Sequence, residues 1–325
     1  MRWTDRIGRR LKLHDLHILM AVAQQGSMAK AARELAVSQP VVSKTISDLE
    51  RTVGAKLLDR TRYGVEPTLY GRALVKRSNA IFDELRQSIR ELESLADPTV
   101  GELAIGCSES ISSGMLPSII DQFSQRCPRV ILDLDTADTG ILLGKLRDRS
   151  LDLMLARTGE DIWVNQFEAD LNLEVLFNDE LVVAAGAKHR CARSRKIELS
   201  ALANERWIFG PPNTWSHKVL TAAFRACGLS MPEVSLRTLS VHARTSLLTT
   251  GQFVTVLPIS ILRHDLTRLP ITMLPVELPA DPWPVAVVTL KNRTLGPVAE
   301  RFLECARAVA KTISTEPAQK PTLRR

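Results

Sequence analysis

A single stretch, Ser27–Leu57, constrains the fold of this chain more than any other, because it predicts two short helices joined by a tight turn. Val42, Ile46 and Leu49 follow one another at i, i+4 and i+7, which places one apolar stripe on the second helix. At about 100° per residue, the polar residues between them project to the opposite face. The pattern therefore predicts a helix that is buried on one side and free on the other.

The free face of this second helix carries small hydroxyls, an amide and a cation. Its side chains are those of Ser38, Gln39, Pro40, Ser43, Lys44 and Ser47. Ser38 is placed as the N-cap, and a proline in the first turn loses no intrahelical hydrogen bond there. Groups of this kind suit the base edges of a DNA major groove better than a protein core.

The positive charge of the chain is concentrated around the same stretch. Residues 1–77 contain 15 Lys and Arg against 7 Asp and Glu, a net charge of +8, whereas residues 78–325 contain 28 against 29, a net charge of −1. This asymmetry is typical of a polyanion-binding module joined to a neutral domain, and a merely solvated basic face is the alternative.

Two further elements follow the two-helix stretch. Residues 57–68 predict a short hairpin, or wing, in which Arg60 and Arg62 either meet DNA phosphates or the minor groove, or are ordinary surface arginines. Residues 69–96 predict a long polar helix with a thin apolar seam. The seam residues are Leu74, Ile81, Leu85 and Leu92. Because this seam is too narrow for a globular core, it favours a helix–helix dimer contact.

From Gly101 onward, strands and helices alternate. The first five segments predict a βαβαβ unit, hence a parallel sheet, and a second set predicts another α/β lobe with a cleft between the two. We expect lobe I to comprise about residues 98–170 and 267–313, and lobe II about residues 171–266. Residues 314–325 are polar and proline-rich, which predicts a disordered tail.

Several classes of protein are disfavoured by composition and motifs. We find no apolar run near the roughly 18 residues of a membrane span and no secretory signal, so we expect a cytoplasmic protein. The five cysteines and six histidines show no metal-ligand spacing, and no GxSxG, HExxH or glycine-rich phosphate loop is present. We therefore expect no cofactor, no metal and no enzymatic activity.

One set of residues has a distinctive order and spacing between residues 11 and 75. It consists of Leu13-His14-Asp15-Leu16, Gly26-Ser27, Ala31-Ala32-Arg33-Glu34-Leu35, Ser38-Gln39-Pro40-Val41-Val42-Ser43, Leu49-Glu50, Gly54-Ala55-Lys56-Leu57-Leu58, Asp59-Arg60, and Pro67-Thr68 followed by Gly71. In this set, and more loosely over nearly its whole length, the chain resembles the LysR-type transcriptional regulators.

The resemblance implies an α plus α/β architecture in three parts. These are a winged helix-turn-helix DNA-binding domain at 1–68, a linker and dimerisation helix at 69–97, and a two-lobed effector-binding domain of periplasmic-binding-protein type at 98–313. It also implies a homotetramer, built as a dimer of dimers, on double-stranded promoter DNA with an interrupted T…A palindrome. A small-molecule effector (an anion, a sugar or an aromatic acid) and, for an activator, RNA polymerase would be the other partners.

The resemblance also assigns roles to single residues. The resemblance places the free-face residues of the second helix at positions that contact DNA bases and phosphates in the family. Lys44 stands where an arginine is common, which favours a phosphate contact over a bidentate guanine contact. Tyr63 likewise stands where the wing often has arginine.

The family's ligand site lies between the lobes, at helix N-termini and strand ends. The residues at such positions here are Ser108, Ser110, Thr136, Thr214, Trp215 and His242. Hydroxyls and free amides at helix starts favour a small anion or polyol. Each hydroxyl could instead be a simple helix cap, and Trp215 and His242 could be structural. A small-solute binding protein without a DNA role is the alternative function, and an enzyme is a further one.

Overall fold

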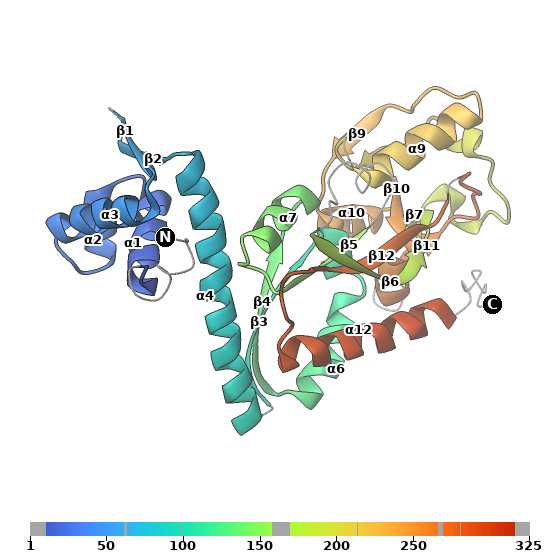
Figure 1. Cartoon of the computed structure of the whole chain (residues 1–325). Coiled ribbons are helices and arrows are strands. Elements are labelled where there is room, and N and C mark those ends of the chain that lie inside the picture. Colours follow the sequence, from blue (N-terminus) through green and yellow to red (C-terminus); the bar gives the residue numbers. More distant parts are fainter. Residues whose placement is uncertain are drawn as a thin grey trace. The chain divides into compact units, whose positions relative to one another are not determined.

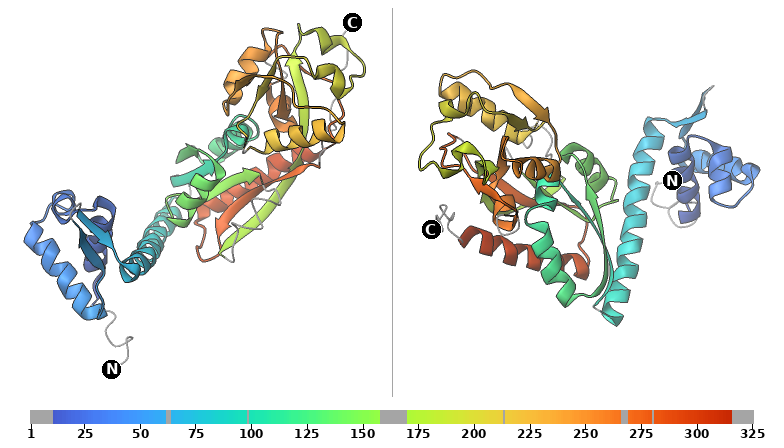
Figure 2. Two further views of the ribbon diagram at one scale, coloured as in Figure 1. Left: turned by 90° about the horizontal axis from the view of Figure 1, so that it is seen from above. Right: turned by 180° about the vertical axis from the view of Figure 1, so that it is seen from behind.

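The computed structural model describes residues 11–61, 64–97, 99–157, 170–212, 214–265, 269–279 and 281–315. The chain divides into two compact units, Met1–Ile89 and Arg90–Arg325. Figure 1 labels the elements of both, and Figure 2 shows them from two further directions. In these described ranges, no helix combines the length and apolarity needed to cross a lipid bilayer.

The first unit is a helix-turn-helix with a wing, as the sequence predicts. Its elements are α1 (Leu13–Gln25), α2 (Met28–Glu34), α3 (Gln39–Val53), β1 (Leu58–Thr61), β2 (Gly64–Pro67) and the start of α4 (Leu69–Ala96). Gly26 ends α1 in the left-handed conformation, with φ of 60°. Ala31 and Ala32 are fully buried, which lets α2 pack closely on its neighbours, and Val42, Ile46 and Leu49 bury the predicted stripe of α3.

The junction between the wing and α4 is a tight backbone contact. The hydroxyl of Thr68 donates to the carbonyl of Lys56 at 2.7 Å and accepts a hydrogen bond from the amide of Gly71 at 3.0 Å. The start of α4 is therefore held directly against the end of the stretch Ser27–Leu57. A Cβ at Gly71 would lie 2.0 Å from the carbonyl oxygen of Leu57. Only glycine permits this approach.

The second unit contains two α/β lobes, each built on a five-stranded sheet. Lobe I has the strand order β4-β3-β5-β12-β6. Its elements are β3 (Val100–Cys107), α5 (Glu109–Ser112), α6 (Leu116–Arg126), β4 (Arg129–Thr136), α7 (Thr139–Arg147), β5 (Leu153–Arg157), β6 (Leu171–Asp179), β12 (Trp283–Leu290) and α12 (Pro297–Thr315). β3 pairs in parallel with β4 and β5, which confirms the predicted βαβαβ unit.

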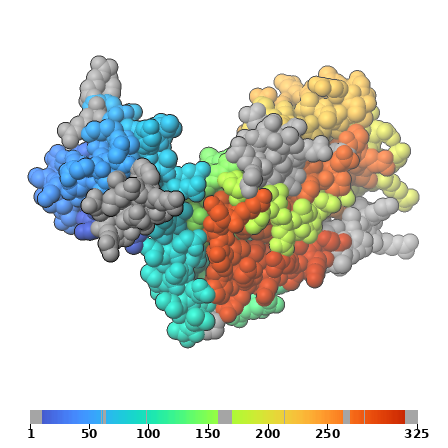
Figure 3. Space-filling view, in the orientation of Figure 1, coloured from blue at the N-terminus to red at the C-terminus, as the bar shows by residue number. Residues whose placement is uncertain are grey.

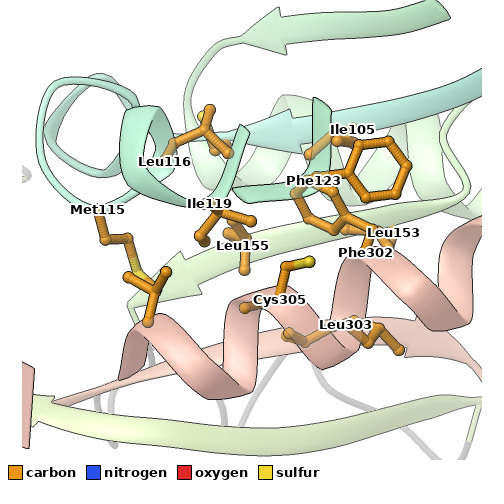
Figure 4. Packing of buried hydrophobic residues seen from close by; sticks show 14 of the residues in the cluster. Ile105, Met115, Leu116, Ile119, Phe123, Leu153, Leu155, Phe302, Leu303 and Cys305 are labelled. Carbon is orange, nitrogen blue, oxygen red and sulfur yellow. The ribbon is translucent and has the colours of Figure 1, made fainter. Parts of the chain in front are cut away.

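Helices cover both faces of the lobe I sheet, so residues Leu153–Ala156 of the central strand β5 are all apolar and buried. Leu153 and Leu155 of β5 pack with α6 and α12, whereas the alternate residues Met154 and Ala156 pack with α7. Figure 4 shows the α6–α12 side of this core. There Phe123 and Phe302 meet edge to face with ring centroids 5.6 Å apart, and burial of each such ring contributes about 1.5–3 kcal/mol.

Lobe II has the strand order β11-β7-β10-β8-β9. Its elements are β7 (Leu181–Gly186), η2 (Arg190–Arg193), η3 (Leu199–Leu202), β8 (Trp207–Phe209), α9 (Trp215–Ala226), β9 (Val234–Arg237), α10 (Val241–Leu248), β10 (Val254–Pro258), α11 (Ile259–Asp265) and β11 (Ile271–Met273). α9 packs on one face of the sheet, and α10 and α11 pack on the other.

The structure corrects the predicted lobe boundaries. β6 runs antiparallel to β12 over its full length and so belongs to lobe I, although lobe II was expected to start at residue 171. β11 pairs with β7 and so belongs to lobe II, although lobe I was expected to resume at residue 267. The polar run Asn178-Asp179-Glu180, which ends β6 and precedes β7, marks the first crossing between the lobes.

The C-terminal helix is also longer than predicted. α12 continues to Thr315, so residues 314 and 315 of the expected disordered tail are helical. The rest of that tail lies outside the described residues. In the space-filling view, the red surface of the last elements adjoins the yellow-green surface of β6, as the β12–β6 pairing requires (Figure 3).

Candidate functional site

The free face of α3 is solvent-exposed as predicted. Ser38, Gln39, Pro40, Lys44 and Ser47 are exposed, and Ser43 is half-buried. Ser38 is the N-cap residue, although its side chain makes no capping hydrogen bond, and the hydroxyl of Ser47 donates to the carbonyl of Ser43 at 2.9 Å. The exposed N-terminal half of α3 therefore presents an amide, a cation and small polar groups.

Glu50, near the end of α3, anchors the strand that leads into the wing. Its carboxylate accepts the amide of Leu57 at 2.9 Å and that of Leu58 at 3.4 Å, and Lys56 donates to it at 2.9 Å. Burial by itself raises the pKa of Glu50, but these hydrogen bonds outweigh burial and lower it below its ordinary value. Glu50 thus fixes the wing relative to α3, a role that no local pattern in the sequence indicates.

Two of the predicted DNA contacts are in the wing. Arg60 lies in β1, opposite Val65 of β2, and its side chain lies outside the described part of the structure. Arg62 lies outside the described residues, as does Tyr63.

The apolar seam of α4 is largely exposed. Ile81 and Leu85 are each 41% exposed, and Leu92 is 68% exposed. Ile89, which the sequence analysis passed over, is 57% exposed and extends the same stripe. Leu74 differs, because it packs against the core of the first unit.

The two lobes meet at a buried ion pair. Arg157, at the end of β5, donates to Asp179 at 2.6 Å, and both side chains are buried. Asp179 also accepts the amide and the hydroxyl of Ser260, at 3.2 and 2.6 Å, at the start of α11 in lobe II. Removing either member of such a pair leaves an uncompensated buried charge.

The same arginine joins several of the predicted effector residues. Its Nε donates to the hydroxyl of Ser110 at 3.3 Å, and Ser110 lies 3.2 Å from the hydroxyl of Ser108. Its guanidinium lies 5.2 Å from the ring centroid of Trp215, which stacks on Trp283 at 4.9 Å. Arg157 therefore brings together Ser108, Ser110 and Trp215, from both lobes.

The other predicted effector residues lie at the ends of neighbouring elements. Thr136 is the last residue of β4 and pairs in register with Cys107. Thr214 caps α9 by position, but its hydroxyl donates to the carbonyl of Pro211 at 2.7 Å instead of capping the helix. His242 is exposed in the first turn of α10.

The thiol of Cys107 is fully buried beneath this site. Burial raises its pKa to about 11, and the nearby charge of Glu109 acts in the same direction, whereas a hydrogen bond with Thr136 opposes it. Because the thiolate is the reactive form, this environment disfavours redox or nucleophilic chemistry at Cys107. In the described ranges, no three His, Cys, Asp or Glu side chains gather into a group that could hold a metal ion.

Two charged residues near the lobe interface, Arg157 and Arg244, were not predicted from the sequence as site residues. Arg157 ends an otherwise apolar strand and was therefore visible in the sequence as a departure from its surroundings, whereas the burial of Arg244 in the mixed polar and apolar helix α10 gave no such signal. The carboxylate partner of Arg157, Asp179, follows it by 22 residues, and no local pattern indicates that pairing.

A winged helix-turn-helix unit followed by a two-lobed α/β domain with a polar interlobe site is the arrangement of a ligand-responsive DNA-binding protein. Family comparison agrees. The model described as "Bacterial regulatory helix-turn-helix protein, lysR family" matches residues 13–72, and "LysR substrate binding domain" matches residues 96–311. The chain therefore belongs to the LysR family of transcriptional regulators, which favours this function over a solute-binding protein without a DNA role.

Individual relatives span almost the whole chain. The uncharacterized regulator YdcI of Escherichia coli K12 is 26% identical, and the alignment covers 92% of this chain and 96% of YdcI. The transcriptional regulator TdcA of the same organism is 27% identical, and the alignment covers 91% of this chain and 92% of TdcA. Among solved structures, full-length OxyR from Pseudomonas aeruginosa aligns with a TM-score of 0.65 at 22% identity (93% and 95% covered). CbnR complexed with its target DNA aligns at 0.61 and 20% identity (92% and 100% covered).

Proposed function

We propose that this regulator reads its promoter with the N-terminal half of α3 and that a small molecule between the lobes alters this binding. The exposed, polar and cationic face of α3 is the observation that carries the proposal. It combines Gln39, whose amide can pair bidentately with adenine, with Lys44, which suits a phosphate. The solved complex of CbnR with DNA supports the same use of this fold.

The α4 seam supports a two-fold dimer. Ile81, Leu85, Ile89 and Leu92 form an exposed apolar stripe along α4. Pairing such stripes from two chains would bury them and present two copies of α3 to two half-sites. We infer a dimer on this helix, and a dimer of dimers as the full assembly.

Gel retardation on the chain's own upstream DNA tests the DNA-binding residues. Lys44→Glu is expected to lower affinity at least tenfold, and removal of one phosphate contact should reduce the slope of log K against log salt by about 1. Gln39→Ala should cost about 1–3 kcal/mol on that DNA and little on unrelated DNA.

The matched control is Lys291→Glu, an equal change of charge on the exposed surface of the second unit. If Lys44→Glu and Lys291→Glu weakened binding equally, the effect would be one of net charge and the assignment of α3 would be refuted. Failure of the wild-type chain to bind its upstream DNA at low salt would refute the proposed function itself.

A thermal-shift screen of small carboxylates, sugars and aromatic compounds tests the effector site. Thr136→Ala and Thr214→Ala should weaken the response to whichever compound stabilises the wild-type chain, without lowering the unliganded melting temperature by more than about 2 °C, roughly 1 kcal/mol for a unit of this size. An unchanged dose dependence in both variants would place the effector elsewhere.

A further inference from the structure

One direct contact between the lobes is made by a carboxylate of the chain itself. Glu109 is the first residue of α5 in lobe I, and its Oε1 accepts the backbone amide of Val241 at 3.2 Å. Val241 is the first residue of α10 in lobe II. The N-terminus of a helix of this length attracts a negative charge, because its amides are unpaired and its dipole is positive there.

A buried cation lies one turn further along the same helix. Arg244 is 5% exposed, and its Nε has no hydrogen-bond partner in the described structure. Among the described residues, its terminal nitrogens donate only to backbone carbonyls, those of Val256 at 3.3 Å and Leu239 at 3.5 Å. Burial lowers the pKa of this guanidinium to about 10, and the negative charge of Glu109 opposes that shift.

The amide of Val241 and the guanidinium of Arg244 together define what we call the α10 anion site. A buried arginine without a bonded carboxylate is unfavourable unless a negative charge lies nearby. In this chain the nearby charge comes from Glu109, across the cleft.

We propose that Glu109 is a built-in carboxylate that occupies the α10 anion site and thereby determines which effectors the cleft accepts. A small carboxylate can bind at this site only by displacing Glu109, so the wild-type cleft discriminates against such ligands there. The inference rests on the proposed function, in which the effector binds between the lobes.

Acetate is a suitable probe of this site, because it reproduces the end of a glutamate side chain. Beyond Cβ, the side chain is CH2–COO−, which corresponds to acetate. Glu109→Ala therefore leaves a gap of the size and charge preference of acetate, next to the amide of Val241 and the cation of Arg244. The full-length wild-type chain, Glu109→Ala and Glu109→Gln are compared by thermal unfolding in sodium acetate and sodium chloride at equal ionic strength and pH.

We expect Glu109→Ala to melt about 2–4 °C below the wild type in chloride. Acetate should restore this loss saturably in Glu109→Ala and should have no specific effect on the wild type or on Glu109→Gln, in which the site is filled. Glu233→Ala, which removes an exposed carboxylate elsewhere in lobe II, is the matched control and should show neither effect. Hydrogen exchange of the first α10 amides should rise in Glu109→Ala and fall again in acetate.

Equal stabilisation of the wild type and Glu109→Ala by acetate would overturn the proposal, as would a Glu109→Ala variant that melts like the wild type and ignores acetate. If Glu109→Ala does not fold, the Glu109→Gln variant provides the test of the proposal. It keeps the shape and removes the charge, so a melting temperature and α10 exchange identical to wild type would refute the proposal. None of these measurements uses DNA or the natural effector, so their failure is distinguishable from failure of the proposed function.

Discussion

The contact of Glu50 with the wing makes a quantitative prediction. In Glu50→Ala, the amide of Leu57 loses a charged acceptor at 2.9 Å, and that of Leu58 loses a longer one at 3.4 Å. A hydrogen bond to a charged group contributes about 1.5–3 kcal/mol, and the longer one contributes less. The pair with Lys56, whose side chain is 79% exposed, adds at most about 1 kcal/mol. We expect the first unit to lose about 2–4 kcal/mol.

Glu50→Gln separates charge from shape. The amide oxygen can still accept from Leu57, so we expect a loss of about 1–2 kcal/mol. Because the pKa of Glu50 is lowered in the folded protein, its contribution is fully present above the ordinary value of about 4.5 and is lost as the pH falls through the lower folded pKa. The difference in stability between the wild type and Glu50→Gln should therefore shrink below about pH 4.5.

Calorimetry of the full-length chain measures these changes as a fall in the transition of the first unit, by about 4–8 °C for each kcal/mol. Hydrogen exchange should locate the loss, with faster exchange at Leu57 and Leu58. Glu34→Ala removes an exposed carboxylate of α2 and is the control. Unchanged exchange at these two amides in Glu50→Ala would refute the reasoning.

Three more variants test other contacts. Leu85→Glu combined with Leu92→Glu should convert the α4 dimer to monomers in analytical ultracentrifugation, and an unchanged mass would exclude the seam. Gly71→Ala brings a Cβ to 2.0 Å from the carbonyl oxygen of Leu57, so the first unit should lose about 1–3 kcal/mol in calorimetry, and a neutral result would contradict the packing. Asp179→Ala leaves the buried guanidinium of Arg157 without its carboxylate and should lower the free energy of unfolding of the second unit by about 3–5 kcal/mol in urea. A loss below about 1 kcal/mol would mean that the ion pair is solvated.

Local patterns were sufficient for much of the fold. The seam predicted α4 with its observed bounds, Leu69–Ala96, because helix periodicity acts within a few residues, and a helix-breaking proline follows at position 98. The N-cap position and the buried stripe of α3 were predictable for the same reason. Their exposed face was predictable as well, since it is what remains once the apolar stripe is buried.

The interlobe site was only partly predictable. Ser108, Ser110 and Trp215 were named because the resemblance implies a ligand site at strand ends and helix starts, and sequence periodicity locates such positions. The partners of Arg157 and Glu109 were not, because Asp179 and Val241 follow them by 22 and 132 residues. The assignment of β6 to lobe I failed for a related reason, since its pairing partner β12 comes more than a hundred residues later.

The position of β12 has a consequence for the order in which the protein is made. β5 and β6 do not pair with each other, and β12 lies between them, antiparallel to both. During synthesis on the ribosome, the edges of β5 and β6 that pair with β12 therefore remain unpaired until all of lobe II has been synthesised. A chain that stops before Trp283 would lack the middle of that sheet and not merely its end. Premature termination there should yield an aggregation-prone fragment rather than a regulator lacking a tail.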